Sequence, residues 1–193
     1  AAGEAQRYLE QAAGLADEPA VRGDLLERAG RHASHDSDLD AAERLLTSAI
    51  ADHASVGDTA AEIRAGQRLC GVEMSLGRYD EAIARGERLL EIAAAREPDA
   101  TLAVLAASLG SLYVFGGNAD RADELLALGL DIGESLRVPE ALTRTFQAKG
   151  WRAVAKGHPE EALAYTKHAL TIALDNQDWE RAFAGYQNLS VFE

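Results

Sequence analysis

The sequence is short of cysteine, proline and aromatic residues, and each shortage argues against a class of protein. Its 193 residues include 1 cysteine, 4 prolines and 2 tryptophans, and aromatic residues make up only 6%. A lone cysteine cannot form an internal disulfide, which fits a reducing compartment. Strands are enriched in β-branched and aromatic residues, whereas this chain has 39 alanines, the best helix former. The composition therefore predicts closely packed helices and no sheet.

Positive charge is also scarce. The formal net charge is −13 and the isoelectric point is about 4.8. A surface of this sign repels the phosphate backbone of nucleic acids and an anionic bilayer. No apolar run approaches the roughly 18 residues of a membrane span, and no secretion signal is recognisable. We therefore expect a cytoplasmic segment that binds neither nucleic acid nor membrane.

The two ends of the sequence suggest a piece of a longer protein. The chain opens with Ala1-Ala2-Gly3, without an initiator methionine, and stops at Phe192-Glu193 inside a helical pattern. Any targeting signal or effector domain would then lie in the rest of the parent chain.

One short motif recurs through the chain at intervals of 40 residues. Each copy has a small residue followed five positions later by alanine, and the copies are Ser37-Asp38-Leu39-Asp40-Ala41-Ala42, Gly77-Arg78-Tyr79-Asp80-Glu81-Ala82, Gly117-Asn118-Ala119-Asp120-Arg121-Ala122 and Gly157-His158-Pro159-Glu160-Glu161-Ala162. Another column of small residues stands twelve positions before the alanine and contains Gly30, Cys70, Gly110 and Gly150. Repetition in several columns at one spacing indicates a repeat architecture.

Each repeat is predicted to form two helices joined by a short turn. The second helices begin at Ala42, Ala82, Ala122 and Ala162, and the turns contain Gly77, Gly116-Gly117 or Gly157. Side chains that can cap a helix occur at Asp58, Asn118 and Asp178, and prolines that suit a first helical turn occur at Pro98, Pro139 and Pro159.

The column of small residues falls within the first helix of each repeat. Two helices approach to about 8 Å only where the side chains between them are small. We therefore expect Gly30, Gly110 and Gly150 to lie at helix crossings. Replacing Gly110 or Gly150 with leucine should overpack the crossing and destabilise the fold by about 1–3 kcal/mol.

This pattern resembles the tetratricopeptide repeat (TPR). That family has a small residue midway along its first helix, an aromatic residue three positions later and an alanine early in its second helix, and Gly110, Tyr113 and Ala122 match it best. The repeat around Cys70 departs from it, with Glu73 in place of the aromatic residue and Gly86 in place of a large apolar one. The period of 40 exceeds the usual spacing of about 34, which resembles the long-repeat subtype of bacterial signalling and transcriptional regulators.

The resemblance implies an all-α fold, a right-handed α-solenoid of antiparallel helix hairpins. We expect a single domain over residues 1–193, with repeats at about 20–56, 57–96, 97–136 and 137–176 and unpaired helices at 3–17 and 178–193. Neither end has an obvious polar capping helix, so self-association through the end helices is one interpretation.

No arrangement of residues indicates catalysis. His32 and His35 could share a helix face, but a third fixed ligand is not evident, so we predict no metal site. Cys70 stands in the column of small residues and is expected to be a buried small hydrophobe. Phosphate-binding loops and nucleophile-elbow motifs are absent from the sequence. The sequence predicts a protein that is not an enzyme and needs no cofactor.

In a TPR-like stack the first helices line the concave face, so the sides of these helices that face away from their packing partners would meet a ligand. The residues predicted to line this groove are Arg64, Gln67, Met74, Val104, Ala107, Ser111, Val114, Phe115, Arg144, Gln147, Trp151 and Val154. Its middle is apolar and its flanks carry arginine, a composition typical of interfaces. Packing between neighbouring helices, or coverage by another part of the parent chain, would also explain these side chains.

The leading interpretation is a protein-interaction or regulatory scaffold whose partner has apolar anchors and an acidic group. Lysine and asparagine side chains of the heat-shock-chaperone carboxylate clamp are missing from the predicted groove. Two alternatives stay open at this point. The first is a domain that senses a small molecule or signalling peptide within a bacterial transcriptional regulator or nucleotide cyclase, and the second is a self-association module.

Overall fold

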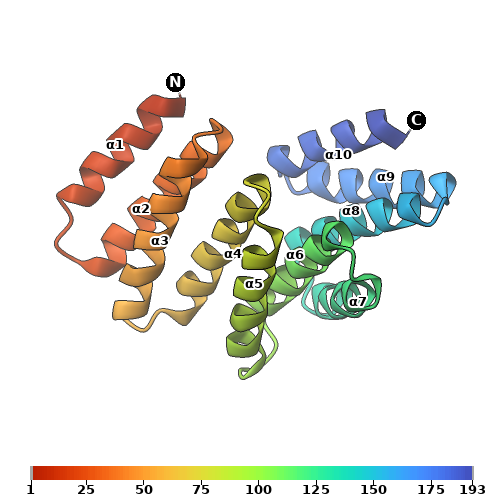
Figure 1. The fold of residues 1–193 in the computed structure, drawn as a ribbon, viewed down its shortest axis with the longest axis horizontal. Helices are drawn as coiled ribbons and strands as arrows, with labels where there is room; N and C mark the ends of the chain where they lie inside the picture. Colours follow the sequence, from red (N-terminus) through yellow and green to blue (C-terminus); the bar gives the residue numbers. More distant parts are fainter. Residues whose placement is uncertain (1, 193) are drawn as a thin grey trace. The chain divides into compact units, whose positions relative to one another are not determined.

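The computed structural model describes residues 2–192, which form ten helices and no strand (Figure 1). The helices are α1 (Ala2–Gly14), α2 (Pro19–His35), α3 (Leu39–Ser55), α4 (Thr59–Ser75), α5 (Tyr79–Ala94), α6 (Ala100–Gly116), α7 (Ala119–Ser135), α8 (Pro139–Ala155), α9 (Pro159–Asp175) and α10 (Trp179–Phe192). The all-α prediction and the pairing of a first with a second helix in each repeat are confirmed. Over the described residues, no helix combines the length and apolar character that crossing a membrane requires.

Helix starts follow the capping signals in the sequence. Three predicted caps accept a hydrogen bond from the backbone N–H three residues later. The acceptors are the carboxylates of Asp58 and Asp178, both at 3.0 Å, and the amide oxygen of Asn118, at 3.2 Å. Pro139 and Pro159 begin α8 and α9, as expected. Pro98 does not lie in a first helical turn, because Asp99 caps α6 by accepting from Leu102 and the helix begins at Ala100.

The turns inside the hairpins share one backbone conformation. Ser37, Gly77, Gly117 and Gly157 all adopt positive φ angles, of 62°, 75°, 85° and 78°. Glycine populates this region freely, whereas a side chain strains it. Ser37 is therefore the strained member of an otherwise glycine column.

Replacing Ser37 with glycine should relieve this strain and raise the free energy of unfolding by about 0.5–1 kcal/mol. Urea denaturation followed by circular dichroism measures the change. Ser48→Gly, on the exposed face of α3, is the control and should destabilise by about 0.5–1 kcal/mol, because glycine is a poor residue inside a helix. A Ser37→Gly variant no more stable than the parent would contradict the strain argument.

The chain divides into two compact units, Ala1–Leu89 and Leu90–Glu193. In the first unit, α2 packs against α1 and α3, and α3 packs against α4. Its core is built from small and branched apolar side chains, namely Ala29, Ala33, Ala42, Leu45, Leu46, Leu69 and Val72.

In the second unit, α6 pairs with α7 and with α8, and α9 packs against both α8 and α10. Its largest fully buried side chains are Leu105, Leu109, Leu125 and Leu126, which come from α6 and α7. The prediction of a single domain over 1–193 remains a prediction.

The predicted helix crossings are confirmed at three glycines. A Cβ atom added at Gly30 would lie 2.8 Å from Leu46, and one at Gly110 would lie 2.9 Å from Leu126. At Gly150 the nearest atom would be the hydroxyl oxygen of Thr166, also at 2.8 Å. Each partner lies sixteen residues further along the chain, on the second helix of the same hairpin.

The repeat around Cys70 makes its close approach at a different position. Cys70 is buried with 4% of its surface exposed, but the tight contact lies one turn earlier, where a Cβ on Gly66 would come within 2.8 Å of Leu89. Burial, reinforced by the nearby Glu73 carboxylate, raises the pKa of the Cys70 thiol to about 12. The thiol is therefore protonated at neutral pH, which confirms the expected role as a buried small side chain.

Candidate partner-binding surfaces

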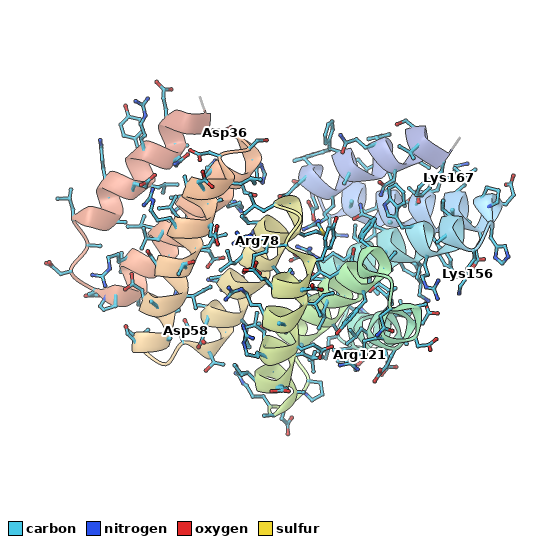
Figure 2. The ribbon with its side chains drawn as sticks, viewed as in Figure 1. Asp36, Asp58, Arg78, Arg121, Lys156 and Lys167 are labelled. Carbon is cyan, nitrogen blue, oxygen red and sulfur yellow. The ribbon has the colours of Figure 1, made fainter. Side chains whose placement is uncertain are left out.

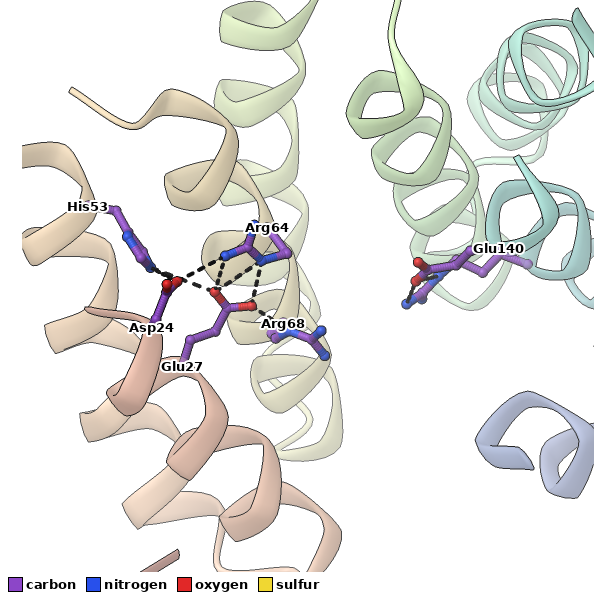
Figure 3. Close-up of polar contacts among 7 residues, drawn as sticks. Asp24, Glu27, His53, Arg64, Arg68 and Glu140 are labelled. Atoms are coloured by element: carbon purple, nitrogen blue, oxygen red, sulfur yellow. Dashed lines mark hydrogen bonds and ion pairs between the residues drawn. The ribbon is translucent and has the colours of Figure 1, made fainter. Parts of the chain in front are cut away.

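Three predicted groove residues, Arg64, Gln67 and Met74, lie on α4 in the first unit. Arg64 is exposed, whereas Gln67 and Met74 are half-buried. The Arg64 guanidinium donates hydrogen bonds to both carboxylate oxygens of Glu27 on α2, at 2.9 and 2.8 Å, and approaches Asp24 at 3.5 Å (Figure 3). Arg64 is thus committed to a contact between helices.

Glu27 is the centre of this polar network. Only 5% of its surface is exposed, and Arg68 donates a further hydrogen bond to it at 2.9 Å. Burial by itself raises the pKa of the Glu27 carboxyl, but the hydrogen bonds from Arg64 and Arg68 outweigh it and hold the pKa below its ordinary value. Glu27 is therefore ionised at neutral pH and joins α2 to α4.

His53 on α3 completes the network. Its ring is buried, and its Nε2 atom lies 3.6 Å from Glu27 and 3.9 Å from Asp24 without forming a hydrogen bond. Within residues 2–192, Asp24, Glu27 and His53 are the group whose potential ligand atoms lie close enough for a metal ion, all within 4.8 Å. The Arg64 and Arg68 charges on Glu27 oppose binding of a cation there. His32 and His35, considered from the sequence, are not part of this group.

The remaining predicted groove residues lie in the second unit, on α6 and α8. Phe115 and Val154 are exposed, at 47% and 39% of their surface. The residues that are half-buried are Val104, Ser111, Val114, Arg144 and Trp151. Arg144 donates to Glu140, one turn earlier on the same helix, at 2.8 Å.

Two predicted residues are covered by neighbouring helices. Ala107 is fully buried, and its backbone nitrogen would lie 3.0 Å from a Cβ on Gly129 of α7. Gln147 is 9% exposed and donates its side-chain N–H to the carbonyl of Arg181 on α10, at 3.0 Å. Their side chains face other helices, so they form no part of the surface proposed below.

Aromatic rings connect three helices of the second unit. The Phe115 and Trp151 rings meet edge to face with centroids 5.7 Å apart, and Trp151 meets Phe192 of α10 in the same way at 4.8 Å. We call Phe115, Trp151, Val154 and Phe192 the aromatic surface. Phe192 was not predicted, since the groove was counted on the four complete repeats and Phe192 lies in the unpaired helix expected at 178–193.

Charge differs sharply between the two kinds of helix. The first helices (α2, α4, α6, α8 and α10) carry nine basic and six acidic residues. The second helices (α1, α3, α5, α7 and α9) carry six basic and seventeen acidic residues. The acidity of the chain therefore belongs mainly to the second helices, and the helices that bear the aromatic surface are neutral to basic.

Neither a family model nor a curated protein matches the sequence. Solved structures do resemble the fold. BtubC (BKLC) from P. vanneervenii aligns over 99% of this chain and 84% of its own, with a TM-score of 0.71 and 18% identity. A kinesin light chain with nearly identical TPR-like repeats, from P. anserina, aligns over 92% and 89%, with a TM-score of 0.64 and 19% identity.

The chain has a TPR-like helical repeat fold. A third structure supports this, a signal transduction ATPase with numerous domains (STAND) that has a tetratricopeptide repeat sensor, from Pyrococcus horikoshii. It aligns over 96% of this chain with a TM-score of 0.68 and 17% identity, but this chain spans only 29% of its length.

Proposed function

We propose that this TPR-like segment is a regulatory scaffold that holds a partner protein on the aromatic surface of its second unit. The observation that carries the proposal is that Phe115 is exposed and its ring meets Trp151, which also meets Phe192, while exposed Val154 follows Trp151 by three residues on the same helix. Exposed aromatic and aliphatic side chains that border polar ones are the usual anchors of an interface.

The partner is a segment with apolar anchor residues flanked by acidic ones. The helix that carries Trp151 and Val154, α8, has three basic residues and one acidic residue, whereas the adjacent α7 has one basic and five acidic residues. An acidic segment would be attracted to α8 and repelled by the second helices. Electrostatic complementarity of this kind sets the orientation and the association rate of a partner.

The test selects peptides from a phage-displayed random library by their binding to the unsubstituted protein. We expect selected peptides to carry aromatic or aliphatic anchors with nearby Asp or Glu, and to bind more weakly as salt rises. Phe115→Asp and Val154→Asp should each weaken binding about tenfold or more, because a carboxylate replaces an apolar contact.

Leu128→Asp is the matched control. The exposed fraction of Leu128, 37%, is close to the 39% of Val154. Leu128, however, lies on α7 among acidic residues. Its substitution should change peptide affinity less than about twofold. Peptides that bind the Phe115→Asp and Leu128→Asp variants equally well would contradict the proposed surface.

A sensing role is the second candidate. It draws on the STAND protein from Pyrococcus horikoshii, whose repeats act as a sensor in that protein. For this chain the role would require a ligand that biases a neighbouring domain through its affinity for one conformation. Binding of a small molecule that is lost in Trp151→Ala, with no peptide selected at all, would favour sensing over the scaffold.

A further inference from the structure

A cavity of about 230 Å³ opens in the second unit, and no residue of the aromatic surface is among those that line it. It lies between α7, α8 and α9, with Leu126 and Ala153 forming part of its apolar wall. The polar side chains that line it are Asp123, Lys149, Arg152, Lys156, Glu161 and Tyr165. We call this cavity the lysine pocket.

The pocket exists because core columns of the repeat change character here. Residues 40, 80 and 120 positions before Lys149 are Leu109, Leu69 and Ala29, and all three are buried. Two equivalents of Arg152 are buried Leu112 and Val72 and the third is His32, while two equivalents of Tyr165 are buried Leu125 and Leu45 and the third is Arg85. Apolar core side chains have thus been replaced by two cations and a phenol in one repeat.

This replacement is unfavourable for folding alone. Lysine and arginine are seldom buried, since removing their charge from water is costly. All three lysines of the chain lie between residues 149 and 167, in a protein with a net charge of −13. Figure 2 shows Lys156 and Lys167 in the α8–α9 region. Side chains that reduce stability at one place in a repeated framework are expected where they serve binding.

The carboxylates of the pocket already have partners. Asp123 accepts two hydrogen bonds from Arg152, at 3.1 and 3.0 Å, and lies 3.7 Å from the Lys156 ammonium. Glu161 lies 3.2 Å from the Nδ1 atom of His158. Burial, together with the nearby Glu161 carboxylate, raises the pKa of the Tyr165 hydroxyl, so this group stays neutral.

Among the residues that the structure describes, Lys149 is the one cation of the pocket lining that forms no ion pair with a carboxylate. It is half-buried, and its ammonium lies 5.7 Å from the centre of the Tyr165 ring. Across residues 2–192, no carboxylate lies within ion-pair distance of it. The lining therefore holds three cations and two carboxylates, which leaves one positive charge to be neutralised.

We propose that the lysine pocket binds a carboxylate, which pairs with Lys149 while its organic part contacts Leu126, Ala153 and the Tyr165 ring. One negative charge balances the pocket, whereas a doubly charged phosphate would make it negative inside an already acidic protein. The carboxylate comes either from a small free acid or from an acidic side chain of a partner. The chemistry at Lys149 is the same in both cases.

The test is a titration followed by amide chemical shifts in the isotope-labelled protein. The probes are sodium benzoate, a free acid, and acetyl-Gly-Glu-Gly-amide, a peptide with one acidic side chain. We expect saturable shifts at Ala153, Lys156 and Tyr165 with at least one probe, and none with neutral benzamide. Tighter binding of benzoate indicates a free acid, and tighter binding of the peptide indicates a partner side chain.

Lys149→Met removes the charge but keeps the length of the side chain. This substitution should lower the affinity for the probe that binds by about tenfold or more, as expected for loss of a charge-assisted contact. Lys167→Met, on the exposed surface of α9 and outside the pocket lining, is the control and should leave the affinity within about twofold. Failure of both probes to give saturable shifts, or an unchanged affinity in Lys149→Met, overturns the proposal.

A stability measurement separates a binding role from a structural one. Lys149→Leu restores the side chain found at the equivalent positions Leu69 and Leu109. If the role of Lys149 is to bind a carboxylate, this variant should no longer bind the probe, and its Tm should be higher by about 2–4 °C. A fall in Tm would show that Lys149 supports the fold, and would count against the proposal.

Discussion

Leucine at position 110 should destabilise the protein by about 3 kcal/mol, at the upper end of the usual range for overpacking. A Cβ at Gly110 would lie 2.9 Å from the Leu126 side chain and 3.2 Å from its backbone nitrogen. The side chain can change rotamer, but the backbone nitrogen belongs to α7 and moves only if the helix moves. Urea denaturation, with the slope and midpoint both fitted, measures the loss.

Gly71→Leu provides the matched control. Gly71 also lies inside a first helix, one position after the column of small residues, and a Cβ there would meet nothing within 4 Å. Leucine has a higher helix propensity than glycine, so this variant should be as stable as the parent or more stable by up to about 1 kcal/mol. Equal destabilisation by the two substitutions would show that the Gly110 crossing is not specifically tight.

Glu27→Gln should lower the free energy of unfolding by about 2–3 kcal/mol. The substitution removes the charge that Arg64 and Arg68 bind and keeps the size of the side chain. Breaking a fully buried ion pair costs about 3–5 kcal/mol, and the figure here is lower because both guanidinium groups are partly exposed and can be solvated. Chemical denaturation at neutral pH and low salt measures the change.

The dependence on pH gives an independent check of the same network. The pKa of Glu27 is lower in the folded protein, so its ionised form stabilises the fold above the unfolded pKa of about 4.3. This contribution is lost as the pH falls through the folded pKa. Between neutral pH and the acid range, the free energy of unfolding should therefore fall more for the unsubstituted protein than for the Glu27→Gln variant.

Glu140→Gln is the control for the ion-pair argument. Glu140 also accepts hydrogen bonds from an arginine, Arg144, but the pair lies one turn apart on one helix and Glu140 is exposed. Its loss should change stability by less than about 0.5 kcal/mol. A Glu27→Gln variant as stable as Glu140→Gln would show that the buried network contributes little.

Packing between helices decides which of the predicted groove residues are exposed. Counting positions from the glycine column placed Phe115 and Val154 on an exposed face, and both are exposed. The same counting included Ala107 and Gln147, which are covered by α7 and α10. Helical periodicity gives the direction of a side chain around its own axis, but not which neighbouring helix covers it.

The lysine pocket was missed for a related reason. Its signal was present in the sequence, because Lys149 stands in a column of leucine and alanine, and Arg152 in one that holds leucine and valine in two of the other three repeats. Reading those columns as core required knowing that Leu69, Leu109 and Leu112 are buried, and burial depends on contacts between helices.

By itself the sequence determined the helical repeat, its period, the turn positions and the glycine crossings. These features are local or recur along the chain, so turn chemistry and helical periodicity are enough to specify them. Only the tertiary structure decided that Arg64 forms an ion pair with Glu27 and that α4 comes closest to its neighbour at Gly66 and not at Cys70. It also decided that a cavity opens beside Lys149. These depend on side chains from different helices, whose meeting is set by three-dimensional packing and the desolvation of charge.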